Sequence, residues 1–197
     1  MQTTLDAYFP FVKHIKDVEC KTLTLKEKVM KSLTVRDLAQ VAFVAALYVV
    51  LTITPPLNAI SYGAYQFRVS EMLNFMAFYN RKYIIGLTLG CMIANFYSFG
   101  LIDVVVGSLS TLVFVSLGVM LFDRYKDQYL FNGLFNKAFF YFSFFFSASM
   151  FTVALELHFF GAPFWLTWFT TAMGELASLL IGSLIMDRLS KRINLSA

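Results

Sequence analysis

The chain is poor in charge and in the residue types that build catalytic or metal sites. Only 14% of its 197 residues are charged, against about a quarter in an ordinary soluble domain. The two histidines, His14 and His158, lie far apart, and no phosphate-binding G-x-x-x-x-G-K-[ST] loop is present. These absences argue against a P-loop ATPase, a metal enzyme and a serine hydrolase with a histidine base. We expect no enzymatic activity, no cofactor, no metal and no nucleic-acid partner.

Cysteine is equally scarce. Cys20 lies in a polar, basic N-terminal stretch and Cys91 in an apolar run, so a disulfide framework is not expected.

Apolar residues dominate what is there. The chain is 58% hydrophobic and 18% aromatic, with 23 Phe. Residues 138–155 carry no charge, and residues 163–186 carry only Glu175. Runs of this length can cross a hydrocarbon core of about 30 Å as helices, and lipid disfavours any segment with unpaired backbone groups. The sequence predicts an all-α integral membrane protein.

Six apolar segments are expected to form the helices: about 36–53, 65–79, 83–97, 101–122, 137–158 and 163–186. We divide the chain into a cytosolic basic tail (1–33), a six-helix membrane domain (34–192) and a short C-terminal tail (193–197). The N-terminal tail is either an interfacial helix or disordered.

Charge predicts the orientation. Every Lys and Arg except Arg68 falls in the N-terminal stretch, in the turn at 80–82, in the loop at 123–137 or at the C-terminus. The alternate loops hold none. Basic flanks stay cytoplasmic, so a multi-pass membrane protein of six spans with both termini inside is expected.

Five charges remain near or inside the membrane: Arg68, Glu71, Asp103, Glu156 and Glu175. With this orientation they converge on the outer part of the bundle, and Glu175 lies roughly 18 Å from Pro163 along its helix. Asn95, Tyr62, Trp165 and Trp168 join that level. Charged groups in a bilayer are functional candidates by default, so we expect a polar pocket open to the outside.

Structural alternatives exist for most of these residues. Arg68 and Glu71, three apart, either form an ion pair on one helix face or contact a ligand. Glu156 and His158 are expected to sit in the membrane interface, and the two tryptophans fit an ordinary aromatic belt. Glu175 has no basic neighbour within a turn and is the strongest candidate for a functional role.

Small residues recur at intervals of four: Gly86 and Gly90, and Ala42 and Ala46. This spacing either packs helices within the bundle or forms a docking face for a partner.

Three stretches resemble the substrate-binding S components of energy-coupling factor (ECF) transporters. They are "VRDLAQVAFVAALYVVLT", "YGAYQFRVSEMLNFMAFYNRKYIIGLTLGCMIANFYS" and "GLIDVVVGSLSTL", within a similarity that covers residues 33–192. The QueT family, assigned to queuosine precursors, is the nearest group. The resemblance implies a high-affinity site near the outer face, and partners comprising one transmembrane coupling subunit and two ATPases. It also implies that Ala42 and Ala46 form the A-x-x-x-A contact with the coupling subunit.

The implied ligand is a 7-deazaguanine with an aminomethyl group, or a related base such as queuine. A carboxylate can accept the two adjacent N–H donors of a guanine-like edge, and a second can pair with the ammonium. We hypothesise that Glu175 and Asp103 divide these roles. Asn95 would contact a ring polar atom and Tyr62, Trp165 or Trp168 would stack, with Glu71 in reserve and Arg68 orienting it.

Other hypotheses stay open: an S component for another heterocyclic cation such as thiamine, an ion-coupled carrier for the same bases, or a structural membrane protein without a ligand.

Overall fold

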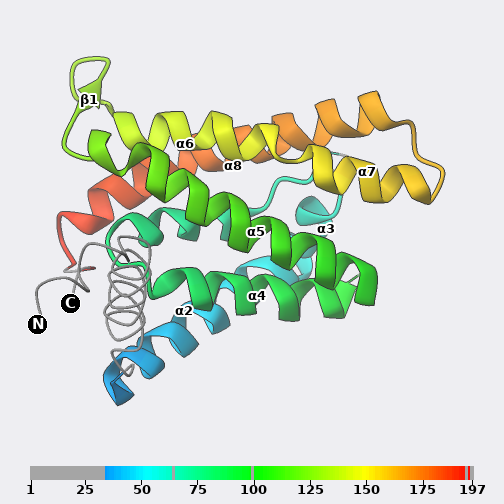
Figure 1. The fold of residues 1–197 in the computed structure, drawn as a ribbon, viewed down its shortest axis with the longest axis horizontal. Helices are drawn as coiled ribbons and strands as arrows, with labels where there is room; N and C mark the ends of the chain where they lie inside the picture. Colours follow the sequence, from blue (N-terminus) through cyan, green and yellow to red (C-terminus); the bar gives the residue numbers. More distant parts are fainter. Residues whose placement is uncertain (1–33, 64, 99, 194, 196–197) are drawn as a thin grey trace, which may run out of the picture. The chain divides into compact units, whose positions relative to one another are not determined.

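The part of the chain that the structure describes is predominantly helical (Figure 1). The computed structural model describes residues 34–63, 65–98, 100–193 and 195, so the predicted tail at 1–33 lies outside the described residues. The elements in chain order are α2 (Val35–Ile53), α3 (Pro55–Ser61), η1 (Val69–Phe78), α4 (Tyr83–Ser98), α5 (Leu101–Phe122), η2 (Asp123–Tyr125), β1 (Tyr129–Leu130), β2 (Phe135–Asn136), α6 (Lys137–Ala148), α7 (Phe151–Phe159) and α8 (Phe164–Ser190).

Within the described part of the chain, four stretches are long and apolar enough to cross a membrane: Val35–Ile53, Leu101–Tyr125, Lys137–Phe159 and Phe164–Ser190. The helix Tyr83–Tyr97 is apolar but shorter. Many large apolar side chains on these helices face outward, among them Phe43, Ile93, Val105 and Leu109. An apolar surface of this extent is typical of a protein surrounded by lipid and not by water. The expected all-α membrane fold is confirmed.

The prolines that end the first segment also begin an unpredicted helix. α2 stops at Ile53, and Pro55 occupies the first turn of α3. Proline lacks an N–H and has a fixed φ, so it breaks a preceding helix but fits the start of a new one.

The second predicted segment differs from the expectation. Residues 65–68 are not helical, and the ten residues Val69–Phe78 form a 3-10 helix. At about 2.0 Å per residue this helix advances about 20 Å, against about 15 Å for an α-helix of the same length. The tighter winding lets a short segment pass through the bundle, where eight of its residues are buried.

A line of small residues on α8 receives this segment. The hydroxyl of Ser178 donates to the backbone carbonyl of Arg68. A Cβ added at Gly182 would lie 2.3 Å from Cβ of Met72, and one at Gly174 would lie 1.4 Å from the carbonyl oxygen of Tyr65. Small residues spaced by four thus let the 65–72 backbone lie directly on α8.

Gly86 and Gly90 serve the same purpose on α4. A Cβ at Gly86 would lie 2.7 Å from the carbonyl oxygen of Val41, and one at Gly90 would lie 2.7 Å from Cβ of Tyr48. This glycine pair therefore packs α4 against α2. Ala42 and Ala46 lie elsewhere on α2 and are exposed.

The apolar core joins η1 to α6 through aromatic rings. Phe142 meets Phe75 and Phe78 edge to face, with centroids 5.6 and 5.4 Å away. Phe139 lies 4.5 Å from Phe75. Such pairs add about 0.5–1.5 kcal/mol each to the burial of the rings, and all four are buried.

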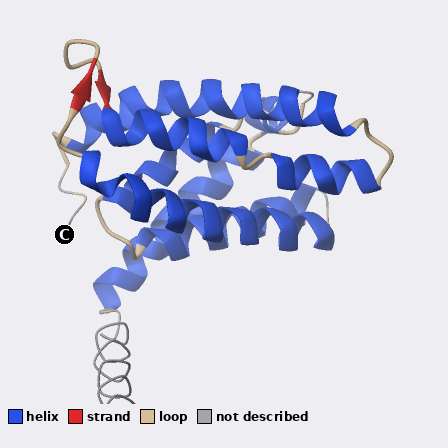
Figure 2. Ribbon diagram, turned by 45° about the horizontal axis from the view of Figure 1, so that its top comes forward, coloured by secondary structure: helices blue, strands red, loops and turns tan. Residues whose placement is uncertain are grey.

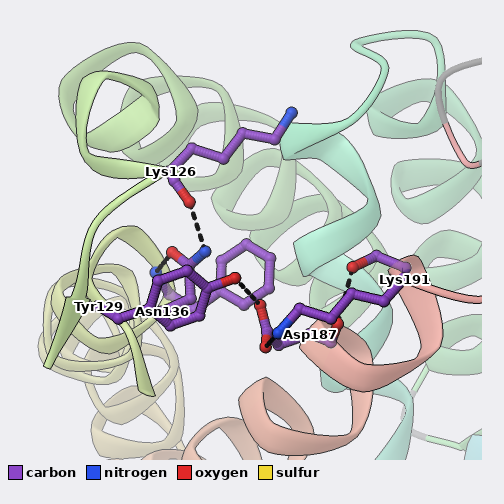
Figure 3. Close-up of polar contacts among 7 residues, drawn as sticks. Lys126, Tyr129, Asn136, Asp187 and Lys191 are labelled. Carbon is purple, nitrogen blue, oxygen red and sulfur yellow. Dashed lines mark hydrogen bonds and ion pairs between the residues drawn. The ribbon is translucent and has the colours of Figure 1, made fainter. Parts of the chain in front are cut away.

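A two-stranded hairpin lies at one end of the bundle (Figure 2). Lys126 Nζ donates to the carbonyl of Phe78 and Tyr129 contacts Asp187, so residues 79–83, 123–137 and 187–192 lie at this end, which we call the hairpin end. Asn136 caps α6, accepting from the amide of Ala138 at 3.0 Å, and its Nδ2 donates to the carbonyl of Lys126 at 2.5 Å. Figure 3 shows the tie to α8. Tyr129 Oη donates to Asp187 at 3.0 Å and Lys191 Nζ donates to it at 2.7 Å. The Asp187 hydrogen bond raises the pKa of Lys191.

Candidate substrate site

The opposite end of the bundle holds a cavity of about 590 Å³, which we call the charged cavity. Residues before η1, the first turn of α5, α7 and the residue after α7 line it. These lining residues are Gln66, Arg68, Leu101, Ile102, Asp103, Val153, Glu156, Leu157 and Phe160. A mostly apolar cavity of this size with a few convergent polar groups is typical of a small-molecule site.

Two carboxylates lie next to each other in the wall of this cavity. Asp103 comes from the first turn of α5 and Glu156 from α7, and they interact electrostatically. Each has a buried oxygen, Oδ2 of Asp103 and Oε2 of Glu156, that receives no hydrogen bond from the described residues. Adjacent acids without donors favour a cationic or N–H-rich ligand.

Glu156 lines the charged cavity, which the sequence did not indicate. We expected it to sit in the membrane interface, and the structure adds that this residue is only 8% exposed and faces the cavity. The helical register of α7 decides this, since it directs Glu156 inward with Val153 while exposing His158. The sequence feature that could have indicated this role is that few acidic residues occur in or near the apolar segments.

Arg68 is the cation of the charged cavity. It is buried, its Nε has no acceptor among the described residues, and its Cζ lies 5.0 Å from the ring centroid of Tyr62. It interacts electrostatically with all four acids of this region, Glu71, Asp103, Glu156 and Glu175.

The ion pair considered between Arg68 and Glu71 does not form in the described part of the chain. Arg68 is the extended residue before η1, with φ −99° and ψ 104°, so the two are not on one helix face. Glu71 instead accepts from Tyr48 Oη and from Asn74 Nδ2, the latter at 2.5 Å. Residues three apart eclipse in a 3-10 helix, which places Asn74 over Glu71.

Glu175 lies with Glu71, outside the residues that line the charged cavity. Its side chain is 1% exposed, and its Oε1 has no donor among the described residues. The two acids interact electrostatically. Sequence reasoning paired Glu175 with Asp103 around a ligand, whereas the structure brings Asp103 together with Glu156.

Asn95 joins three segments beside the charged cavity. Its Nδ2 donates to the carbonyl oxygen of Asp103 at 3.2 Å, and its Oδ1 accepts from Tyr62 Oη at 3.3 Å. Gly107 gives it room, since a Cβ there would lie 2.1 Å from Nδ2. Asn95 thus fixes the start of α5, which carries Asp103.

A second cavity of about 390 Å³ adjoins the first, and we call it the threonine groove. Gln66 and Leu157 line both. The remaining lining residues of the groove are Tyr62, Gly63, Ala162, Pro163, Leu166, Thr167, Thr170 and Thr171. Trp165 and Trp168 pack on each other at 5.9 Å, and Trp168 Nε1 donates to the carbonyl of Ala148 at 3.1 Å. Neither tryptophan is among the residues that line these two cavities.

Gln66 is the polar residue that sequence reasoning missed. Its φ of 43° lies in the left-handed region, which glutamine seldom adopts and which concentrates at functional sites. Its backbone N–H donates to the carbonyl of Gly63 at 3.0 Å, and the carbonyl of Tyr65 packs against Gly174. No local sequence signal predicts this conformation, because α8 imposes it.

No metal site accompanies these residues: the described part of the chain holds no group of three or more His, Cys, Asp or Glu that could hold an ion.

An apolar helical bundle with a solute-sized charged cavity at one end defines a multi-pass membrane protein that binds a small solute. Comparison with known proteins identifies the family. Residues 38–191 match the family model described as QueT transporter, and the chain belongs to this transporter family. It is 64% identical over 168 residues, 85% of this chain and 99% of the other, to the "Queuosine precursor transporter QueT" of Lactococcus lactis subsp. cremoris (strain MG1363). No solved structure matches the chain.

Proposed function

We propose that the protein is the substrate-binding membrane subunit of an ECF-type importer and that it captures a queuosine precursor from outside the cell. The observation that carries the proposal is the charged cavity, where Asp103, Glu156 and Arg68 converge in a chain of the QueT transporter family. The substrate named for the Lactococcus lactis relative supports the ligand class.

The ligand is a 7-deazaguanine base whose aminomethyl group is a cation at neutral pH. In this proposal, Asp103 and Glu156 divide the two donor groups: one accepts the paired N–H donors of the purine edge and the other pairs with the ammonium. Arg68 and Gln66 reach the ring carbonyl or ring nitrogens. Hydrogen bonds to charged groups contribute about 1.5–3 kcal/mol each.

The other predicted site residues keep supporting roles. Asn95 and Tyr62 hold the cavity wall through their mutual hydrogen bond. Glu71 and Glu175 lie near Arg68 inside the bundle and interact with it electrostatically. Trp165 and Trp168 flank the groove residues Leu166 and Thr167 in sequence. Their fluorescence is therefore expected to change when a ligand enters.

We further propose six spans with both termini in the cytosol of the bacterial cell, so that the charged cavity opens outward. The residue ranges of the hairpin end contain Arg81, Lys82, Arg124, Lys126, Lys137, Arg188, Lys191 and Arg192. Basic flanks stay cytoplasmic. In this arrangement η1 and α4 are the second and third spans, and α6 with α7 forms the fifth.

Uptake is powered by partners: one transmembrane coupling subunit and two ATPases. Ala42 and Ala46 form the proposed docking face, and their exposure on α2 supports this role, since small residues allow close approach of a partner helix.

Calorimetry of the purified protein with the aminomethyl deazaguanine, guanine and thiamine tests the ligand class. We expect saturable binding of the aminomethyl base, weaker binding of guanine, which lacks the ammonium, and none of thiamine. Binding of thiamine alone, or of no compound, would refute the proposed substrate. Separate copurification with ATPase subunits from the native membrane tests the partners.

A further inference from the structure

The threonine groove differs in chemistry from the charged cavity it adjoins. None of its ten lining residues is charged, whereas the charged cavity holds Arg68, Asp103 and Glu156. The groove has aliphatic walls, including Leu157, Pro163 and Leu166, and a row of hydroxyls from Tyr62 and three threonines of α8. A charged ligand group therefore belongs in the first space, and a neutral one in the second.

Two threonine hydroxyls of the groove, those of Thr170 and Thr171, are set to accept hydrogen bonds. Thr170 Oγ1 donates to the carbonyl of Leu166 at 3.0 Å, and Thr171 Oγ1 donates to that of Thr167 at 2.8 Å. The Tyr62 hydroxyl donates to Asn95. Since each hydroxyl has one proton and two lone pairs, Thr170 and Thr171 can still accept hydrogen bonds from donors such as ligand hydroxyl groups.

Gln66 connects the two spaces. It lines both cavities, is only 9% exposed, and has a left-handed backbone that its surroundings hold in place. An amide offers donors and an acceptor on one side chain. It is therefore suited to a ligand that continues from the charged cavity into the groove.

We propose that the threonine groove is a subsite for a neutral, hydroxylated hydrocarbon substituent carried on the amine of the base. The amine stays beside Asp103 and Glu156, and the hydroxylated ring extends past Gln66 toward Thr170 and Thr171. The substrate class is then a substituted deazaguanine such as queuine, with its cyclopentene diol, in preference to the bare aminomethyl base. This inference rests on the proposed function.

The test compares queuine with the aminomethyl base by calorimetry on the full-length protein. Wild type is expected to bind queuine roughly 10-fold more tightly. T170V and T171V keep the side-chain shape and remove the hydroxyl. Each should weaken queuine binding by about 3- to 10-fold and leave binding of the aminomethyl base within about 2-fold.

Two controls separate a subsite from a folding defect. T170S and T171S retain the hydroxyl and should keep wild-type preference. T88V removes the same type of bond, since Thr88 Oγ1 donates to the carbonyl of Ile84 at 2.8 Å on α4, and should change neither affinity.

The outcomes distinguish the subsite from the proposed function. If wild type binds the aminomethyl base as tightly as queuine, or the valine variants weaken both bases equally, the subsite is refuted while the proposed function stands. If neither base binds, the proposed function fails and the subsite with it.

Discussion

The guanidinium of Arg68 lies over the ring of Tyr62, and the hydroxyl of the same tyrosine donates to Asn95. One aromatic side chain therefore positions both the only cation of the charged cavity and the amide that anchors the start of α5. Because Arg68 interacts with four acids without a close ion pair in the described structure, its position depends on this ring.

Substitutions of Tyr62 separate these two contacts. Tyr62→Phe keeps the ring and loses the bond to Asn95, whereas Tyr62→Leu loses both. A cation–π contact contributes about 0.5–2 kcal/mol, so the leucine variant should bind the base about 2- to 30-fold more weakly than the phenylalanine variant in calorimetry. Equal affinities would show that the stacking of Arg68 has no role in binding.

Neutralising either cavity acid should reduce affinity. Asp103→Asn and Glu156→Gln each remove a charge-assisted bond, with an expected loss of about 10- to 100-fold in affinity for the aminomethyl base. Asp127→Asn, at an exposed position of the hairpin end, is the matched control and should bind as wild type. Unchanged affinity in both cavity variants would refute their assignment.

The contact between Gly174 and the Tyr65 carbonyl predicts a steric effect. Gly174→Ala would place a methyl 1.4 Å from that oxygen, so the 65–68 backbone must shift, at a cost of about 1–3 kcal/mol or more. A lower thermal midpoint in detergent and weaker base binding are expected. Ala177→Val, on the exposed side of α8, adds volume without a collision and should leave both measurements unchanged.

The Tyr48 hydroxyl supports Glu71 inside the bundle. Tyr48→Phe leaves one buried carboxylate oxygen without this donor, and the expected loss of stability is about 1–3 kcal/mol. Denaturant unfolding monitored by tryptophan fluorescence measures it. Combining Tyr48→Phe with Glu71→Gln should cost less than the sum of the single changes, because the two groups form one hydrogen-bonded pair. Strict additivity would contradict that coupling.

Docking through α2 predicts a variant that binds but does not transport. Ala42→Leu and Ala46→Leu enlarge the proposed contact face and should abolish uptake into cells while leaving base binding by the purified protein unchanged. Val50→Leu, also exposed on α2, serves as a control. Normal uptake in both alanine variants would place the partner elsewhere.

The sequence determined the solvent of this protein and the limits of its helices. Apolar runs bounded by prolines and charges predicted α2, α4, α5 and α8 closely, because helix length and hydropathy are local properties that lipid enforces. The predicted segment 137–158 is divided into α6 and α7 in the structure. The scarcity of charge also singled out five residues, because a charged side chain within a membrane is costly unless it has a partner or a function. They are Arg68, Glu71, Asp103, Glu156 and Glu175.

Only the tertiary structure decided how those residues are grouped. The 3-10 winding of η1 brings Asn74 over Glu71, so that the two side chains are hydrogen-bonded. The register of α7 directs Glu156 into the cavity that Asp103 also lines. The Tyr65 carbonyl packs closely against Gly174, and this contact holds the neighbouring Gln66 between the two cavities. These arrangements depend on contacts between segments distant in the chain, and no spacing within one segment specifies them.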